Sequence, residues 1–231
     1  MFDLGRSLSH PFEDRDWAVK MLVGAGVNLV PVLNFALYGY AMDHLRNTAR
    51  SQDVPLPKWD DLGKHFVDGL MLFVAQLIYS IPIIALIVGF AVISVIYGVS
   101  MDESAHSAQD VMTAGFVVVM ITLACLSVVY GLFFAFITPA MYIQVARTGE
   151  IGSAFRFNEM FALIKRRPTD YLIIVILPVA LGIVLGVAFS VLAAIPFVGL
   201  CLYFPLLIVA LLATPYMYIV SGHWYGQLLR D

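Results

Sequence analysis

Long runs of apolar residues alternate with short polar segments along the chain. No Asp, Glu, Lys or Arg occurs from Leu70 to Met101, from Val111 to Ala146, or from Tyr171 to Leu229. Each run exceeds the ~20 residues that a transmembrane helix needs, and the last is long enough for two helices. The pattern predicts an all-α, polytopic transmembrane helix bundle. Its four full spans are expected at 70–99, 111–146, 171–194 and 197–218.

The first apolar region, Trp17 to Met42, is interrupted. Pro31 removes a helical hydrogen bond and disfavours helix at the residue before it. Asn28 and Asn34 flank this proline. We expect a helix break within 28–34, buried against the later spans, with the two asparagine amides satisfying the backbone groups freed at the break.

Two half-helices are therefore expected, over about 18–30 and 32–46. Each would rise only ~20 Å, which is short of the ~30 Å hydrocarbon core. A hairpin that enters the membrane and returns on the same side fits this length. A full crossing of the membrane by 17–46 is the alternative.

Two polar segments have amphipathic patterns. In the first, over 56–70, apolar residues recur at helical spacing and charged residues occupy the other face. It predicts a short helix in the membrane interface with Trp59 at headgroup depth; an ordinary loop is the alternative. The residues that define this segment are Leu56, Pro57, Trp59, Asp60, Asp61, Phe66, Asp68 and Gly69.

A second interfacial helix is expected within 149–167, with Phe157 on its apolar face. It ends on three consecutive basic residues, Lys165, Arg166 and Arg167. These side chains could bind anionic lipid headgroups, although a topology signal is the simpler reading. We expect Trp59 and Phe157 to point into the bilayer or the bundle.

Lysine and arginine are distributed unevenly. The segment 43–68 contains four of them and 147–170 contains five, whereas 100–110 contains none. Because basic loops stay in the cytoplasm, the first two segments are predicted to be cytoplasmic and 100–110 external. A re-entrant 17–46 would place the N-terminus in the cytoplasm too.

We expect a single integral membrane domain, 1–231. Residues 1–69 and 149–231 are a possible internal repeat. The segment Pro31 to Tyr38 resembles Pro196 to Tyr203 in its apolar and aromatic positions. Repeats of this kind are common in transporters, but they do not establish transport.

Composition gives no indication of catalysis. The chain is 61% hydrophobic and 13% charged, with a net charge of −3 and no basic tract for nucleic acid. The five histidines and two cysteines show no metal-ligand spacing, and no nucleophile or phosphate-loop motif occurs. We therefore expect no enzyme activity, no cofactor and no metal.

Several of these residues form a pattern that is similar to a known family. It comprises Gly39-Tyr40, Arg46, Leu56-Pro57-x-Trp59-Asp60-Asp61, Phe66-x-Asp68-Gly69-Leu70 and Tyr79-x-x-Pro82. The chain resembles the prokaryotic membrane family Domain of Unknown Function 4013 over nearly its whole length. The resemblance implies a prokaryotic cytoplasmic (plasma) membrane and a multi-pass protein, and it supplies no catalytic residues.

Two functions remain open from the sequence. The first is a non-catalytic scaffold or accessory subunit that binds membrane lipids and associates with itself or other membrane proteins. The second is a channel or transporter for a small solute or lipid, using a cavity at the broken N-terminal helix. A wet cavity lined by Asn28, Asn34 or Gln76 would favour transport, and a dry bundle the scaffold.

The charge asymmetry makes a topology prediction. In intact cells, a membrane-impermeant thiol reagent should label Ser104→Cys and leave Ser51→Cys unlabelled, because 43–68 faces the cytoplasm. Lysed cells provide the control, in which both variants should react. Labelling of Ser51→Cys alone in intact cells would reverse the predicted orientation.

Overall fold

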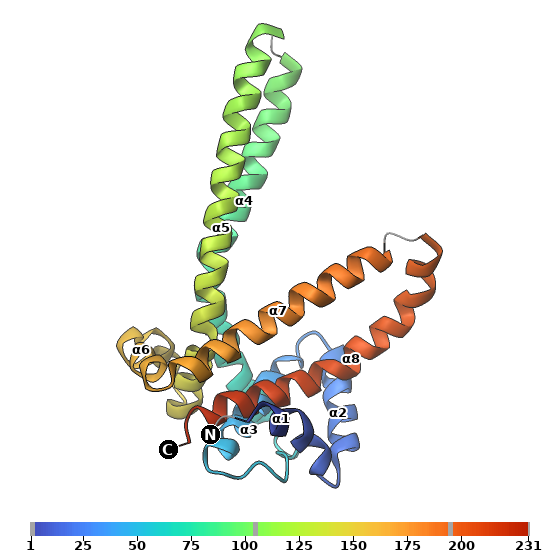
Figure 1. The fold of residues 1–231 in the computed structure, drawn as a ribbon, viewed down its shortest axis with the longest axis vertical. Coiled ribbons are helices and arrows are strands. Elements are labelled where there is room, and N and C mark those ends of the chain that lie inside the picture. The colour runs from blue at the N-terminus through green and yellow to red at the C-terminus, as the bar shows by residue number, and fades with distance from the viewer. Residues whose placement is uncertain (1–2, 104–105, 194–195, 231) are drawn as a thin grey trace. The chain divides into compact units, whose positions relative to one another are not determined.

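The computed structural model describes residues 3–103, 106–193 and 196–230 (Figure 1). These residues form eight α-helices and two short 3₁₀ helices, with no strand among them, so the all-α prediction is confirmed. The elements are α1 (Leu4–Ser9), η1 (His10–Glu13), α2 (Trp17–Leu29), α3 (Phe35–Ala49), α4 (Leu62–Glu103), α5 (His106–Thr148), η2 (Ile151–Phe155), α6 (Phe157–Arg166), α7 (Pro168–Ala193) and α8 (Pro196–Gln227).

Four of the described helices are long and apolar enough to cross a membrane. Their qualifying stretches are Leu62–Gly98, Thr113–Thr148, Pro168–Val187 and Pro205–Gln227. The four predicted spans therefore coincide with α4, α5, α7 and α8.

The chain divides into two compact units. Unit 1 contains residues 1–75 and 138–231, and unit 2 contains residues 76–137. Unit 2 is a hairpin made from parts of α4 and α5. Within it, the rings of Tyr97 and Phe116 stack with centroids 4.0 Å apart, and the Tyr130 hydroxyl donates to the Tyr79 carbonyl oxygen.

The structure corrects the expected separate helix over 56–70. Residues 56–61 form a loop, and α4 begins at Leu62 and continues unbroken to Glu103. The Asp61 carboxylate caps its first turn by accepting the Lys64 N–H at 2.9 Å. Because no proline separates the amphipathic turns from the following apolar run, and the one glycine there, Gly69, packs against Phe35, the helix does not end between them. The second amphipathic helix is separate, as α6.

The break in the first apolar region is confirmed. Helix α2 ends at Leu29 and α3 begins at Phe35. Backbone bonds turn the chain between them, including Asn34 N–H to the Val30 carbonyl at 3.1 Å.

Two details of that expectation are wrong. The tip of the hairpin is exposed in this chain, with Leu29 64% and Val32 61% accessible. The asparagine amides were expected to donate to the freed carbonyls, but the Val27 and Val30 carbonyls accept from the backbone N–H groups of Val30 and Asn34, and Asn34 Oδ1 is buried without a partner among the described residues. Backbone turns supply the bonds instead.

The hairpin leaves and returns on the same side of unit 1. The Asp14 carboxylate, just before α2, accepts the Leu56 N–H at 2.6 Å and the Lys20 ammonium at 2.8 Å. Asp14 thus joins the start of the hairpin to the segment that follows it. This path is the one that a re-entrant 17–46 requires.

Helix α3 lies at the centre of unit 1 and touches its neighbours backbone to backbone. A Cβ atom at Gly39 would lie 1.8 Å from the His65 carbonyl oxygen on α4, and one at Gly69 would lie 1.7 Å from the Phe35 oxygen. On the other side, a Cβ at Gly222 of α8 would lie 2.7 Å from the Ala41 oxygen. Only glycine allows these approaches, so the glycines fix where the three helices cross.

This packing predicts that one added methyl group at Gly39 strongly lowers the stability of the fold. Gly39→Ala should destabilise the fold by about 3 kcal/mol or more, because the clash is with backbone that cannot rotate away. Gly26→Ala is the matched control, because a Cβ atom at Gly26 in α2 would have no neighbouring atom within 4 Å. Thermal unfolding of the purified protein measures both. Equal unfolding temperatures for the two variants would contradict the backbone contact.

Candidate functional site

The two ends of the chain meet in a buried polar region. The Asp3 carboxylate caps α1 by accepting the Arg6 N–H at 2.9 Å. Ser7 of α1 then contacts α8, and His10, the first residue of η1, contacts α3. Gln227, near the end of α8, accepts the Asp3 N–H at 2.8 Å. Figure 1 shows α1 beside α8.

Three histidines from distant segments form the centre of this region, which we call the histidine cluster: His10, His44 and His223. All three are fully buried. His10 Nε2 lies 2.9 Å from His44 Nε2, and the rings of His10 and His223 stack with centroids 4.1 Å apart. Sequence spacing did not reveal the cluster, because its members come from three elements. In the sequence, only the nearby glycines Gly222 and Gly226 indicated that this face of α8 packs closely against another segment.

The hydrogen bonds define the tautomers of the cluster. His10 Nδ1 faces the carbonyl oxygens of Ser7 at 3.0 Å and Arg6 at 3.2 Å, so Nδ1 carries the proton. Its Nε2 must then accept from the Nε2–H of His44. His223 Nδ1 lies 2.9 Å from the Gln227 amide nitrogen, so it accepts there and Nε2 carries the proton. Neutral rings satisfy every one of these contacts.

Burial also favours the neutral form. It lowers the pKa of His10, and it lowers the pKa of His44 well below the ordinary value of 6.5, with neighbouring His10 adding to the effect for His44. His44 Nδ1 is buried without a hydrogen-bond partner among the described residues. The cluster is therefore a place where protonation costs stability.

Asp53 holds the cluster to both ends of the chain. Its carboxylate contacts Arg230, Arg6 Nε at 3.4 Å and His223 Nε2 at 3.4 Å. Burial alone would raise the pKa of Asp53, but the His223 N–H and the Arg230 and Arg6 guanidinium groups hold it below its ordinary range. Arg230 Nε also donates to the Thr48 carbonyl at 2.7 Å, at the end of α3.

Ser7, His223 and Asp53 follow one another as in a hydrolytic triad, but their setting does not suit one. Ser7 Oγ lies 2.8 Å from His223 Nδ1, and its hydroxyl also lies 2.7 Å from the Asp3 carbonyl. Ser7 and His223 are fully buried, so a substrate carbonyl has no approach to Oγ. These contacts hold α1, α8 and the segment that contains Asp53 together.

The cluster is also unsuited to holding a metal ion. Ligand nitrogens must point at a common centre in the plane of each ring, whereas His10 and His223 are stacked face to face. Within residues 3–103, 106–193 and 196–230, no three His, Cys, Asp or Glu side chains are placed to hold a metal.

A second polar group joins α3 to the first turns of α4. Asp43 accepts from Arg46 Nη1 at 2.9 Å, from Lys64 Nζ at 2.6 Å and from His65 Nε2 at 3.1 Å. Arg46 Nη1 also donates to Asp68 at 2.5 Å. Burial alone would raise the pKa of Asp43, but the three donors hold it well below its ordinary range.

The loop 56–61 is fixed from three sides. The Tyr40 hydroxyl donates to the Pro57 carbonyl at 2.8 Å, and the Tyr40 ring stacks on Trp59 with centroids 4.3 Å apart. Trp59 Nε1 donates to the Lys20 carbonyl at 3.0 Å, while Leu56 is 1% exposed. Trp59 therefore lies within the bundle, as expected.

The remaining motif residues have separate positions. Asp60 is exposed at the loop and Phe66 packs near Phe35, with ring centroids 6.1 Å apart. Phe157, on α6, is 41% exposed.

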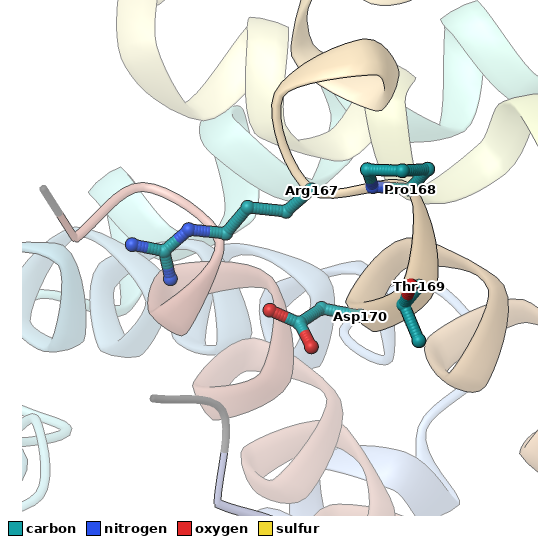
Figure 2. Close-up of a pocket in the computed structure, with 4 residues that line it drawn as sticks. All are labelled: Arg167, Pro168, Thr169 and Asp170. Carbon is teal, nitrogen blue, oxygen red and sulfur yellow. The ribbon is translucent and has the colours of Figure 1, made fainter.

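The basic run 165–167 is divided between solvent and structure. Lys165 and Arg166 are exposed on α6. Arg167 donates from Nη2 to the Arg230 carbonyl at 2.7 Å and from Nη1 to the Gln227 carbonyl at 3.3 Å, which satisfies backbone oxygens at the end of α8. Figure 2 shows its side chain extended away from Pro168 and Thr169, beside a hollow of about 380 Å³ that Asp170 also lines.

The histidine cluster predicts that the terminal docking depends on pH. Because the pKa values of buried His10 and His44 lie below 6.5, the unfolded chain binds more protons than the folded one as the pH falls below 6.5. Docking of residues 3–13 should be strongest above this value and weaken below it. Hydrogen exchange of these residues at about pH 5.5 and about pH 7.5, corrected for intrinsic rates, measures the change.

Two variants separate the cluster from other histidines. His44→Gln keeps a donor for His10 Nε2 and removes one titrating group, so it should flatten the pH dependence. His106→Gln removes a histidine at the start of α5 and should leave it unchanged. A flattened response in His106→Gln, or an unchanged one in His44→Gln, would refute the assignment.

Comparison with known proteins gives one match. No curated protein and no solved structure matches the chain. The family described as protein of unknown function DUF4013 matches residues 23–194, which includes α3, the loop 56–61 and the spans α4 and α5. The chain therefore belongs to the DUF4013 family, as its sequence motifs had indicated.

Proposed function

We propose that this protein is a non-catalytic scaffold or accessory subunit of a prokaryotic cell membrane, which associates with itself or another membrane protein through the hairpin of α4 and α5. The observation that carries the proposal is the uncovered apolar length of this hairpin. The helices have 42 and 43 residues, and no residue in the most apolar stretch of either is buried.

The length exceeds what a bilayer covers. The uncharged parts of the hairpin outside unit 1, residues 76–101 and 111–137, would rise ~39 Å and ~40 Å as helix. At the average tilt of about 20° they still rise about 37 Å and about 38 Å against a ~30 Å core. Apolar length beyond the hydrocarbon core favours a protein partner.

The polar end of unit 1 suits a scaffold because it is tightly bonded. Arg230, Asp53 and Gln227 connect the last turn of α8 to the N-terminal segment and to the end of α3. Such a connected set of buried bonds makes the polar end of unit 1 rigid.

Transport through the broken helix is the alternative, and one hollow beside α2 bears on it. This hollow has a volume of about 500 Å³ and lies between α2, η1 and α8. Its lining is almost wholly apolar: Phe12, Trp17, Ala18, Met21, Leu22, Val209, Leu212, Ala213 and Tyr216. Such a lining fits an acyl chain better than a polar solute, so the hollow favours lipid contact over solute passage.

Association can be tested with two tagged copies of the chain in native membranes. Val128→Ala with Leu132→Ala removes packing atoms from α5, where each side chain is 62% exposed. Val184→Ala with Leu185→Ala is the matched control on α7, where the side chains are 64% and 59% exposed. The α5 pair should reduce capture of the second copy or of a membrane partner by about tenfold, and the α7 pair should not.

Two results would count against the proposal. One is a chain that remains monomeric and captures no membrane protein after mild crosslinking. The other is a conductance or flux in reconstituted vesicles that Asn28→Leu with Asn34→Leu abolishes, which would favour transport.

A further inference from the structure

We propose that the polar end of α3 carries a binding site for a phosphate group, in a hollow lined by Arg46, Arg50, Lys58 and Lys64. This site is separate from the association surface proposed above. It is also distinct from the basic run 165–167 on α6.

The hollow is built from three segments of unit 1. The last turns of α3 supply Asp43, Arg46, Asn47 and Arg50, the loop supplies Pro57 and Lys58, and the first turn of α4 supplies Lys64. Its volume is about 320 Å³, which is within the ~300–1,000 Å³ of small-molecule sites. Four of the seven lining residues are cationic and one is acidic.

The charges that line the hollow leave a positive excess. Asp43 and the adjacent Asp68 are matched by Arg46 and Lys64, with which they form short ion pairs. Asp60 and Asp61, in the same loop as Lys58, do not line the hollow. Arg50 and Lys58 are exposed, and in the described part of the chain neither forms an ion pair. The site therefore has two uncompensated positive charges, close to the charge of a phosphate monoester dianion.

The acids also hold the basic groups in position. Arg46 donates from Nε to the Ala146 carbonyl at 2.9 Å and from Nη1 to both carboxylates. Among the described residues these bonds leave Arg46 Nη2 available to a ligand. A guanidinium fixed in this way loses little conformational freedom on binding an anion.

Positive charge continues on the other side of the same two arginines. Arg46 and Arg50 also line a neighbouring hollow of about 390 Å³, together with Arg147 and no acidic residue. The N-terminal end of α4, beside Lys64, adds the positive end of a helix dipole. The negative end of α3 opposes it, so the side-chain cations decide the sign of the site.

The location suggests two sources of the phosphate. Trp59 and Lys58 lie in one loop next to the spanning helix α4, where the headgroups of an anionic leaflet would lie. A soluble phosphate compound offers the same anion. The chemistry shared by both is a phosphate group bound by two or more fixed cations.

The test compares two variants that lose equal charge. Arg50→Gln with Lys58→Gln removes the unpaired cations of the hollow, whereas Arg15→Gln with Arg156→Gln removes two exposed cations that lie outside it. Thermal unfolding of the full chain checks that both variants fold. One arm measures phosphatidic acid retained from mixed nanodiscs by native mass spectrometry. The other titrates inorganic phosphate into protein in phosphatidylcholine nanodiscs.

We expect the first variant to weaken binding at least about tenfold in one arm or both, since two charge-assisted contacts are lost. The control should stay within about twofold of the parent protein. An effect confined to phosphatidic acid identifies a lipid headgroup as the ligand, and an effect with inorganic phosphate identifies a soluble one. Equal loss in both variants, loss only in the control, or no binding to the parent protein overturns the proposal.

Discussion

The approach of α3 to α4 and α8 at backbone distance is the constraint on which unit 1 depends. Gly39 and Gly69 remove the Cβ atoms that would separate α3 from α4, and Gly222 does the same for α8. Because helices without these side chains approach closely, their polar ends come together as well. Asp43 then reaches Lys64 and His65, and His44 reaches His10. The ionic and histidine contacts are consequences of where the glycines let the helices cross.

The polar contacts on the two sides of α3 differ in charge. Toward α4, Asp43 and Asp68 each have a cationic partner, and Arg46 is fixed by three acceptors. Toward α8, the central groups are neutral imidazoles whose burial disfavours protonation. A buried ion pair and a buried neutral network both specify one arrangement, because a shifted register would leave polar groups unsatisfied. The first holds the motif loop, and the second holds the two ends of the chain.

Much of the fold could be predicted from sequence, because composition alone fixes the spans and Pro31 fixes the break in the first region. The separate helix over 56–70 could not, since α4 simply continues from amphipathic turns into an apolar span. The histidine cluster was also beyond sequence spacing. His10 and His223 are brought together by the return of α1 onto α8, a contact that no local pattern specifies. The sequence motif contains both Arg46 and Asp68, but their ion pair could not be predicted without knowing where α3 and α4 cross.

At the tip of the hairpin, backbone N–H groups form hydrogen bonds that the asparagine side chains were expected to form. A proline within a helix frees carbonyl groups, and amides nearby are the obvious donors. Here residues 31–34 form a turn, and the Val30 and Asn34 N–H groups donate to the carbonyls of Val27 and Val30. The side chains at the tip can then be apolar, and Leu29 and Val32 are exposed. Exposed apolar side chains suit contact with hydrocarbon better than contact with water, which is the placement that the re-entrant prediction for 17–46 requires.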